Sequence, residues 1–150
     1  LHAHHDGRTI VGICGGYQML GQTVSDPDGI EGSISKLPGL GLLPIDTVMT
    51  AEKTTSRVEF EFEGEKCYGY EIHQGRSTTE KQILQENNCI GTYLHGFLDN
   101  APVINYLLKN KATNTPQISP EEFKNMQYDL LADHVRKYVN INELYKIMGL

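Results

Sequence analysis

Hydrophobic positions in the first part of the chain mark a strand followed directly by a helix. Residues 9–14 (TIVGIC) form a continuous run of β-branched and apolar side chains. Such a run predicts a central strand of a parallel sheet, covered on both faces. The glycine pair 15–16 interrupts this run, and residues 17–20 (YQML) predict a helix that ends near Gly21. Strand, glycines and helix in this order are typical of a nucleophile elbow.

A different pattern, strict alternation, predicts an antiparallel hairpin further along the chain. Residues 58–63 (VEFEFE) alternate apolar and acidic positions, which indicates a half-buried strand with one acidic face. Gly64 then turns the chain back into residues 66–73 (KCYGYEIH). Residues 89–94 predict a further strand, whereas residues 26–44 are rich in Gly, Pro, Asp and Ser and predict mostly loop.

The last third of the chain predicts helices. One helix begins near Asn100, and residues 119–122 (SPEE) form a capping box with proline at the first helical position of the next. Asn142 is predicted to cap a short final turn that ends at Gly149. We find no internal repeat and no clear domain boundary. The predicted fold class is therefore α/β: a sheet flanked by helices, with an antiparallel hairpin.

Composition and charge narrow the function classes. The 150 residues are 39% apolar and 21% charged, with a net charge of -6. An acidic surface argues against nucleic acid or an anionic membrane as the main partner, because both favour clustered Lys and Arg. No apolar run approaches the roughly 18–20 residues that span a bilayer. The start of the chain lacks a signal-peptide pattern, and three widely spaced cysteines do not resemble a disulfide framework, so we expect a cytoplasmic protein.

Cys14 carries the main candidate chemistry, because it lies in the segment 12–16 (GICGG) at the junction of strand and helix. Backbone N–H dipoles at a helix start favour a thiolate, which is the nucleophilic form of cysteine. The N–H groups of Gly15 and Gly16 can point at an oxyanion formed on the attacked carbonyl. A buried structural cysteine is the alternative, and it is the role we predict for Cys67 and Cys89. For Cys14 the glycine frame favours a catalytic nucleophile.

A nucleophilic cysteine needs a base, and two histidines end predicted strands. His95 follows residues 89–94, and His73 closes residues 66–73. Active sites in α/β sheets collect at strand ends, so position alone makes the two equal candidates. The histidines at positions 2, 4 and 5 lack a second ligand cluster, and we predict no metal site. No Walker-type loop is present, so we predict no ATP site in this chain.

Four sequence blocks then show a resemblance. Residues 12–21 (GICGGYQMLG) resemble the nucleophile motif of class I (triad-type) glutamine amidotransferases, in the branch found at the C-terminus of cobyric acid synthases. Three further blocks agree in the same order: residues 39–44 (GLGLLP), 69–76 (GYEIHQGR) and 91–97 (GTYLHGF). The likeness spans nearly the whole chain and implies a flavodoxin-like sheet flanked by helices.

The resemblance also implies a reaction and roles. Cys14 would attack the side-chain amide carbon of glutamine, ammonia would leave, and water would hydrolyse the thioester to give glutamate. His95 would be the general base and acid. The substrate would be bound by Gln18 and His73, and by Gly15 and Gly16, whose N–H groups would hold the oxyanion. In cobyric acid synthases the ammonia passes to a synthetase domain, which uses ATP and Mg²⁺ to amidate carboxylates b, d, e and g of a corrinoid, adenosyl-cobyrinic acid a,c-diamide.

Two departures from the family pattern modify this expectation. Most class I amidotransferases have an acidic residue two positions after the histidine, and here that position is Phe97. The working unit is therefore a Cys–His pair, for which Glu71 is a candidate third member. In addition, the elbow begins close to Leu1, so we expect residues 1–150 to be a partial amidotransferase domain that lacks its N-terminal part and the synthetase domain. We expect such a fragment to be inactive alone, and an unpaired strand to invite pairing with a second copy.

Several alternatives remain open from the sequence. The amidotransferase domain of cobyrinic acid a,c-diamide synthase, or one that acts on cell-wall precursors, is a near neighbour. A non-catalytic interaction module could retain the elbow as scaffolding. An unrelated cysteine hydrolase could use the same elbow.

Overall fold

The structure is a computed structural model that describes residues 1–108 and 118–150. The chain forms two compact units, residues 1–110 and residues 111–150. The described strands all lie in the first unit, and the described part of the second contains two helices. The mixed α/β class predicted from the sequence is confirmed.

A three-stranded sheet carries the elbow. Its order is β1 (Ile10–Ile13), β7 (Cys89–Thr92) and β6 (Ile83–Glu86), with β1 parallel and β6 antiparallel to β7. The prediction that β1 is a central strand covered on both faces is wrong for the described residues, because β1 lies at the edge of this sheet. Val11 and Ile13 are accordingly only half-buried. The continuous apolar run correctly indicates a parallel strand, which pairs with β7, but it does not indicate whether that strand is central or at the edge of the sheet.

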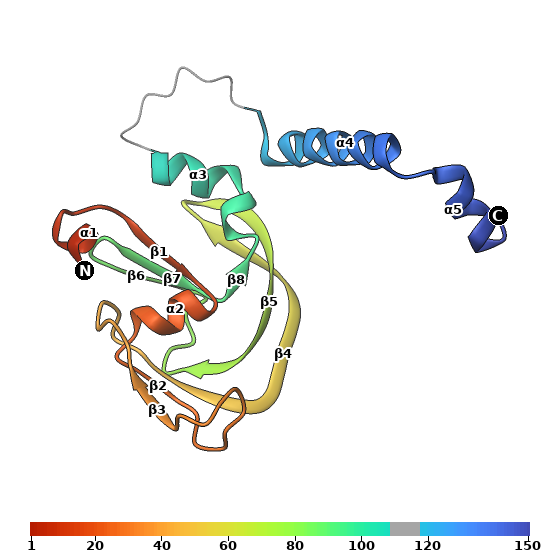
Figure 1. Cartoon of the computed structure of the whole chain (residues 1–150). Helices are drawn as coiled ribbons and strands as arrows, with labels where there is room; N and C mark the ends of the chain where they lie inside the picture. The colour runs from red at the N-terminus through yellow and green to blue at the C-terminus, as the bar shows by residue number, and fades with distance from the viewer. Residues whose placement is uncertain (109–117) are drawn as a thin grey trace. The chain divides into compact units, whose positions relative to one another are not determined.

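A five-stranded sheet forms the rest of the first unit. In spatial order its strands are β3 (Lys36–Pro38), β2 (Thr23–Ser25), β4 (Asp46–Phe62), β5 (Glu65–Ser77) and β8 (Leu94–His95). Strands β4 and β5 form the predicted antiparallel hairpin, which runs as a long curved ribbon along one side of the unit (Figure 1). Glu63 and Gly64 both take positive φ values, 52° and 79°, as a tight hairpin turn requires.

Strand β4 begins well before the alternating segment 58–63. Its first residues pair with both β2 and β5, and the register shifts between Met49 and Thr54. The segment 46–57 contains Ala, Glu and Lys among its threonines, so local propensity for a strand is weak there. Pairing with strands that are distant in sequence supplies what local propensity does not.

The predicted strand 89–94 divides into two. Strand β7 ends at Thr92, and β8 begins at Leu94 and pairs with β5 of the other sheet, where Tyr70 lies opposite His95. Tyr93 therefore stands where the chain crosses from one sheet to the other. This crossing brings the elbow, which is attached to β7, next to the middle of β5.

The helices of the first unit are α1 (His2–His5), α2 (Gly15–Leu20), the 3-10 turn η1 (Phe97–Asp99) and α3 (Ala101–Leu108). The predicted helix after the glycine pair is thus confirmed as α2. Tyr17 and Leu20 on α2 are buried against Leu43 and Ile45, whereas Phe97 and Val103 pack under the hairpin. Cys67 and Cys89 are both fully buried, as predicted, and burial raises the pKa of each thiol.

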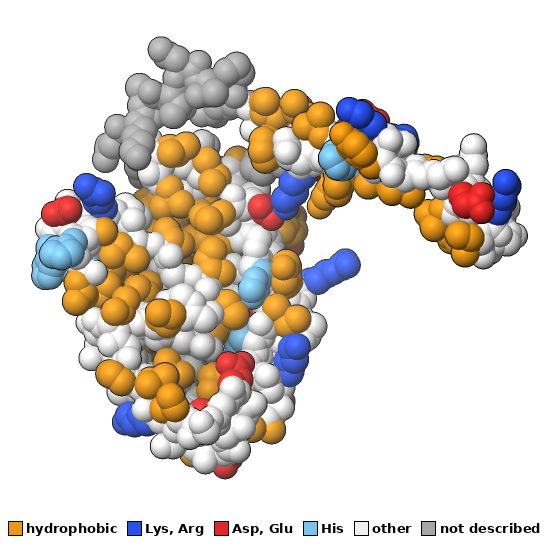
Figure 2. All heavy atoms as spheres, in the orientation of Figure 1, with side chains coloured by type: hydrophobic (Ala, Val, Ile, Leu, Met, Phe, Trp, Pro, Cys, Tyr) orange, Lys and Arg blue, Asp and Glu red, His pale blue; other side chains and the backbone are white. Residues whose placement is uncertain are grey.

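The second unit contains α4 (Pro120–Tyr138) and α5 (Ile141–Met148). Helix α4 begins with the predicted capping box, in which Ser119 and Glu122 exchange side-chain-to-backbone hydrogen bonds of 3.1 and 2.9 Å. The cap of α5 is Asn140 rather than Asn142, because Asn140 precedes the first turn and its side chain accepts a hydrogen bond from the Glu143 N–H. Hydrophobic side chains are exposed along α4 (Figure 2). Among the described helices, none combines the length and the hydropathy that a membrane span needs.

Candidate active site

Cys14 occupies the turn between β1 and α2 in a strained backbone conformation. Its φ is 53° and its ψ is -115°, a combination that non-glycine residues rarely adopt. Its N–H donates to the carbonyl of Thr92 at 2.9 Å, which extends the parallel pairing of β1 and β7 through the turn. The positive φ is therefore borne by the cysteine itself and not by the neighbouring glycines. This is the sharp strand-to-helix turn of a nucleophile elbow.

The neighbouring glycines have two different functions. A side chain at Gly12 would collide with Leu20 at 2.6 Å and with the carbonyl of Gly16 at 2.8 Å, so Gly12 lets α2 fold back closely on β1. Around Gly15 and Gly16, by contrast, no heavy atom of the described residues beyond the local backbone lies within 4 Å of an added Cβ. The start of α2 therefore has open space beside these two glycines.

The thiol of Cys14 contacts strand β5. Its Sγ lies 3.8 Å from the carbonyl oxygen of Ile72, a weak hydrogen bond in which the thiol donates. Within residues 1–108 and 118–150, no hydrogen bond joins this thiol to either candidate base. The structure thus brings Cys14 to the strand that carries His73 and that pairs with the strand of His95.

The ring of His95 stacks on a neighbouring aromatic ring. Its ring lies on that of Tyr70, with centroids 5.0 Å apart and planes at 12°. Its Nε2 is buried and has no hydrogen-bond partner among the described residues. A buried polar atom without a partner is uncommon in native proteins and often marks a functional group. The imidazole therefore has one buried nitrogen without a hydrogen-bond partner among the described residues.

His73 has partners at both ring nitrogens. Its Nδ1 lies 2.8 Å from the carbonyl oxygen of Gly75, and its Nε2 lies 3.7 Å from the carboxylate of Glu71. Side chains alternate between the two faces of a strand, and Glu71 and His73 lie one and three residues after Tyr70 on β5. They therefore point to the opposite face of β5 from the Tyr70–His95 stack. The structure consequently places Glu71 beside His73 and not beside His95.

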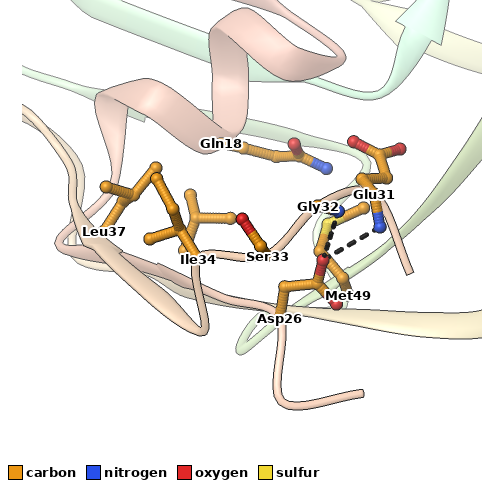
Figure 3. Close-up of a pocket in the computed structure, with 9 residues that line it drawn as sticks. Gln18, Asp26, Glu31, Gly32, Ser33, Ile34, Leu37 and Met49 are labelled. Carbon is orange, nitrogen blue, oxygen red and sulfur yellow. Dashed lines mark hydrogen bonds between the residues drawn. The ribbon is translucent and has the colours of Figure 1, made fainter. Parts of the chain in front are cut away.

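Gln18 stands one helical turn after Cys14 and lines a pocket of about 400 Å³. Cys14 itself is not among the described residues that line this pocket, so Gln18 is the residue that connects the pocket with the helix of the elbow. Figure 3 shows the amide of Gln18 reaching from α2 into this pocket, with Glu31 and Met49 on the facing walls. The other lining residues are Val24, Asp26, Gly32, Ser33, Ile34 and Leu37.

Asp26 fixes the loop that forms one wall of the pocket. Its buried carboxylate accepts hydrogen bonds from the backbone N–H groups of Ile30, Glu31 and Gly32, at 2.7, 2.9 and 3.2 Å. These bonds, led by that of Glu31, lower the pKa of Asp26 below its ordinary value. The carboxylate is engaged by its own loop, so it orders the wall rather than presenting a free charge.

Comparison with known proteins identifies the family. The model of the CobB/CobQ-like glutamine amidotransferase domain matches residues 1–103. The chain belongs to the CobB/CobQ-like glutamine amidotransferase family. The resemblance to class I glutamine amidotransferases predicted from four sequence blocks is therefore confirmed.

Relatives of this amidotransferase domain include cobyric acid synthases. The chain is 44% identical to that of Bacteroides fragilis over 168 residues, which cover 99% of this chain and 34% of the relative. It is 42% identical to that of Phocaeicola vulgatus, covering 99% and 34%, and 40% identical to that of Parabacteroides distasonis, covering 97% and 34%. The chain spans about a third of the length of these relatives.

Sequence reasoning did not include Asp26, which lines the pocket, or Tyr93, which contacts the lining residue Gln18. Asp26 opens the segment 26–29 (DPDG), whose composition indicates a turn without showing which carboxylate would bind the loop. Tyr93 lies within the block 91–97 beside His95, and the hydroxyl at this position contacts Gln18 at 3.4 Å. The block 91–97 already contained the candidate His95, and this was the signal in the sequence that could have pointed to Tyr93.

Proposed function

We propose that this domain is the glutaminase part of a cobyric acid synthase, with Cys14 as its nucleophile. The observation that carries the proposal is the backbone of Cys14, which is held at positive φ at an open helix start in a family of glutamine amidotransferases. Strain of this kind is maintained where it exposes a reactive side chain. The identity to cobyric acid synthases over nearly the whole chain supports the choice of acceptor.

The glutaminase reaction would proceed in two steps. The Cys14 thiolate attacks the side-chain amide carbon of glutamine, and the N–H groups of Gly15 and Gly16 stabilise the oxyanion. His95, which has taken the proton of the Cys14 thiol, donates it to the departing nitrogen, ammonia leaves, and a thioester remains. Water then loses a proton to His95 as its oxygen attacks the thioester carbon, and glutamate and the free thiol are released. The free Nε2 of His95 supports its part in both proton transfers.

The ammonia would be consumed outside residues 1–150. Following the family resemblance described above, a synthetase domain that uses ATP and Mg²⁺ would amidate carboxylates b, d, e and g of adenosyl-cobyrinic acid a,c-diamide. In this proposal glutamine and the synthetase domain are the partners, the setting is cytoplasmic, and residues 1–150 are part of a longer amidotransferase domain.

Covalent labelling tests the proposed nucleophile. A chloroketone analogue of glutamine, applied to the complete protein, is expected to modify Cys14 and to be competed by glutamine, as located by peptide mass spectrometry. Cys67 and Cys89 serve as internal controls, because both are fully buried with raised thiol pKa values. Absence of labelling with an intact fold would favour a non-catalytic module, and labelling that glutamine does not compete would favour a general cysteine hydrolase.

A further inference from the structure

A chain of hydroxyl groups links the pocket to the sheet behind it. The hydroxyl of Tyr93 accepts a hydrogen bond of 3.4 Å from Nε2 of Gln18 and shares another of 2.9 Å with Oγ of Ser77. The Ser77 hydroxyl in turn shares a hydrogen bond of 2.9 Å with Oγ1 of Thr47, which is fully buried. The relay Gln18–Tyr93–Ser77–Thr47 therefore runs from the pocket side chain into the core.

Two aromatic contacts hold the ring of Tyr93 in place. His73 stacks on one face, with ring centroids 3.8 Å apart and planes at 14°. Tyr17 meets the ring edge-on, at 5.1 Å and 77°. His73 is itself tied to the carbonyl of Gly75 through Nδ1. The phenol of Tyr93 is thus constrained from both sides, and the position of its hydroxyl is set before any substrate binds.

Gly75 lets the amide of Gln18 lie directly against the backbone of β5. A Cβ atom at this position would overlap Nε2 of Gln18 and would lie 2.9 Å from the Thr47 side chain and 3.2 Å from the Tyr93 hydroxyl. Three of the four side chains of the relay thus converge on one backbone position that has no room for a side chain. The amide is confined as well as hydrogen-bonded.

We propose that Tyr93 is a positioning residue that orients the Gln18 amide for recognition of the substrate's α-ammonium group. A primary amide has one donor end and one acceptor end. When Tyr93 accepts from Nε2, Oε1 remains as the acceptor end of the amide, and Glu31 is a second lining residue of the pocket that Gln18 enters (Figure 3). Both groups favour a cation. The inference rests on the proposed function, because it takes glutamine as the substrate.

The test compares two amides in the complete protein. Glutaramate has the same side-chain amide as glutamine but lacks the α-ammonium group. Tyr93→Phe removes the acceptor and keeps the stacked ring, so we expect kcat/KM for glutamine to fall about tenfold through KM, as for the loss of one hydrogen-bonded contact. The value for glutaramate is expected to remain unchanged, and Ser77→Ala is expected to give a smaller loss of the same kind.

Tyr17→Phe is the matched control, because it removes a buried hydroxyl that has no partner among the described residues. It is expected to leave kcat/KM unchanged for both glutamine and glutaramate. An equal loss for both amides in Tyr93→Phe, or a loss confined to kcat, would overturn the positioning role. A smaller preference of Tyr93→Phe for glutamine over its α-methyl ester, relative to the wild type, would also overturn it. That result would mean that the Gln18 amide contacts the carboxylate of the substrate and not its α-ammonium group. If the wild-type protein does not hydrolyse glutamine, the proposed function itself fails. If the wild-type protein is active and Tyr93→Phe leaves kcat/KM for glutamine unchanged, this inference alone fails.

Discussion

The imidazole of His95 lies flat on the ring of Tyr70, with centroids 5.0 Å apart and planes at 12°. Because no hydrogen bond to Nε2 exists among the described residues, this stack is the main observed restraint on that end of the ring. Aromatic pairs contribute about 0.5–1.5 kcal/mol beyond burial. Tyr70→Ala is therefore expected to lower kcat for glutamine hydrolysis by roughly two- to tenfold, whereas Tyr70→Phe keeps the stack and the rate. Tyr68→Ala, on the same face, is the matched control, and an equal effect there would contradict this role.

The two histidines on this part of the sheet should differ in the kinetic constant they affect. His95→Ala is expected to lower kcat by roughly 10²–10⁴-fold, about as much as loss of Cys14 if the two act as a unit. His73→Ala is expected to act mainly on KM, because His73 packs on Tyr93 and its ring nitrogens already have partners. Steady-state kinetics with glutamine separate the two effects. A larger fall in kcat for His73→Ala than for His95→Ala would show that His73, and not His95, is the base.

Asp26 is expected to control the order of the pocket wall. Asp26→Asn keeps the size of the side chain but replaces one acceptor oxygen with a donor, so at least one of the three loop N–H groups loses its partner. We expect faster hydrogen exchange at residues 30–32 and a raised KM for glutamine. Asp28→Asn, in the same turn, is the control for the change of charge. Unchanged exchange at residues 30–32 in Asp26→Asn would show that the carboxylate does not hold the loop.

Tyr17 should make stability fall at high pH. Burial, with a smaller effect of Tyr93, raises the pKa of Tyr17 to about 12. The folded-state pKa lies above the unfolded value of about 10, so the stabilisation is complete below pH 10 and is lost as pH rises through the folded pKa. The full loss, on the order of 2–3 kcal/mol of unfolding free energy, is reached only above the folded pKa, and at about pH 11 the expected loss is roughly 1.4 kcal/mol. Urea unfolding at about pH 8 and about pH 11 measures it, and a fall of the same size in Tyr17→Phe would contradict the assignment to Tyr17.

Local signals in the sequence were sufficient where structure is local. The helix after the glycine pair, the tight turn at Gly64 and the capping box of Ser119 and Glu122 all follow from neighbouring residues, and the structure confirms them. Strand β6 was missed, although residues 86–89 (ENNC) contain a turn signal and Asn87 takes a φ of 53°. A short strand beside a turn is decided by its partner, which here is β7.

Long-range pairing decided what the sequence could not show. The first half of β4 is a strand because β2 and β5 lie on either side of it, and the split at Tyr93 occurs because β8 pairs with β5. The candidate residues Cys14 and Gln18 could be predicted because a motif places them one turn apart. The relay from Gln18 through Tyr93 to Ser77 joins residues that only the folded sheet brings together.

The most direct test of the central claim uses Cys14→Ala in the complete protein, with amidation of the corrinoid acceptor measured from either glutamine or ammonium as the nitrogen donor. Because Cys14 would act only in releasing ammonia from glutamine, we predict that glutamine-dependent amidation is lost and that ammonium-dependent amidation continues at the wild-type rate. Equal loss of both activities, or glutamine-dependent amidation that survives without the thiol, would contradict the account.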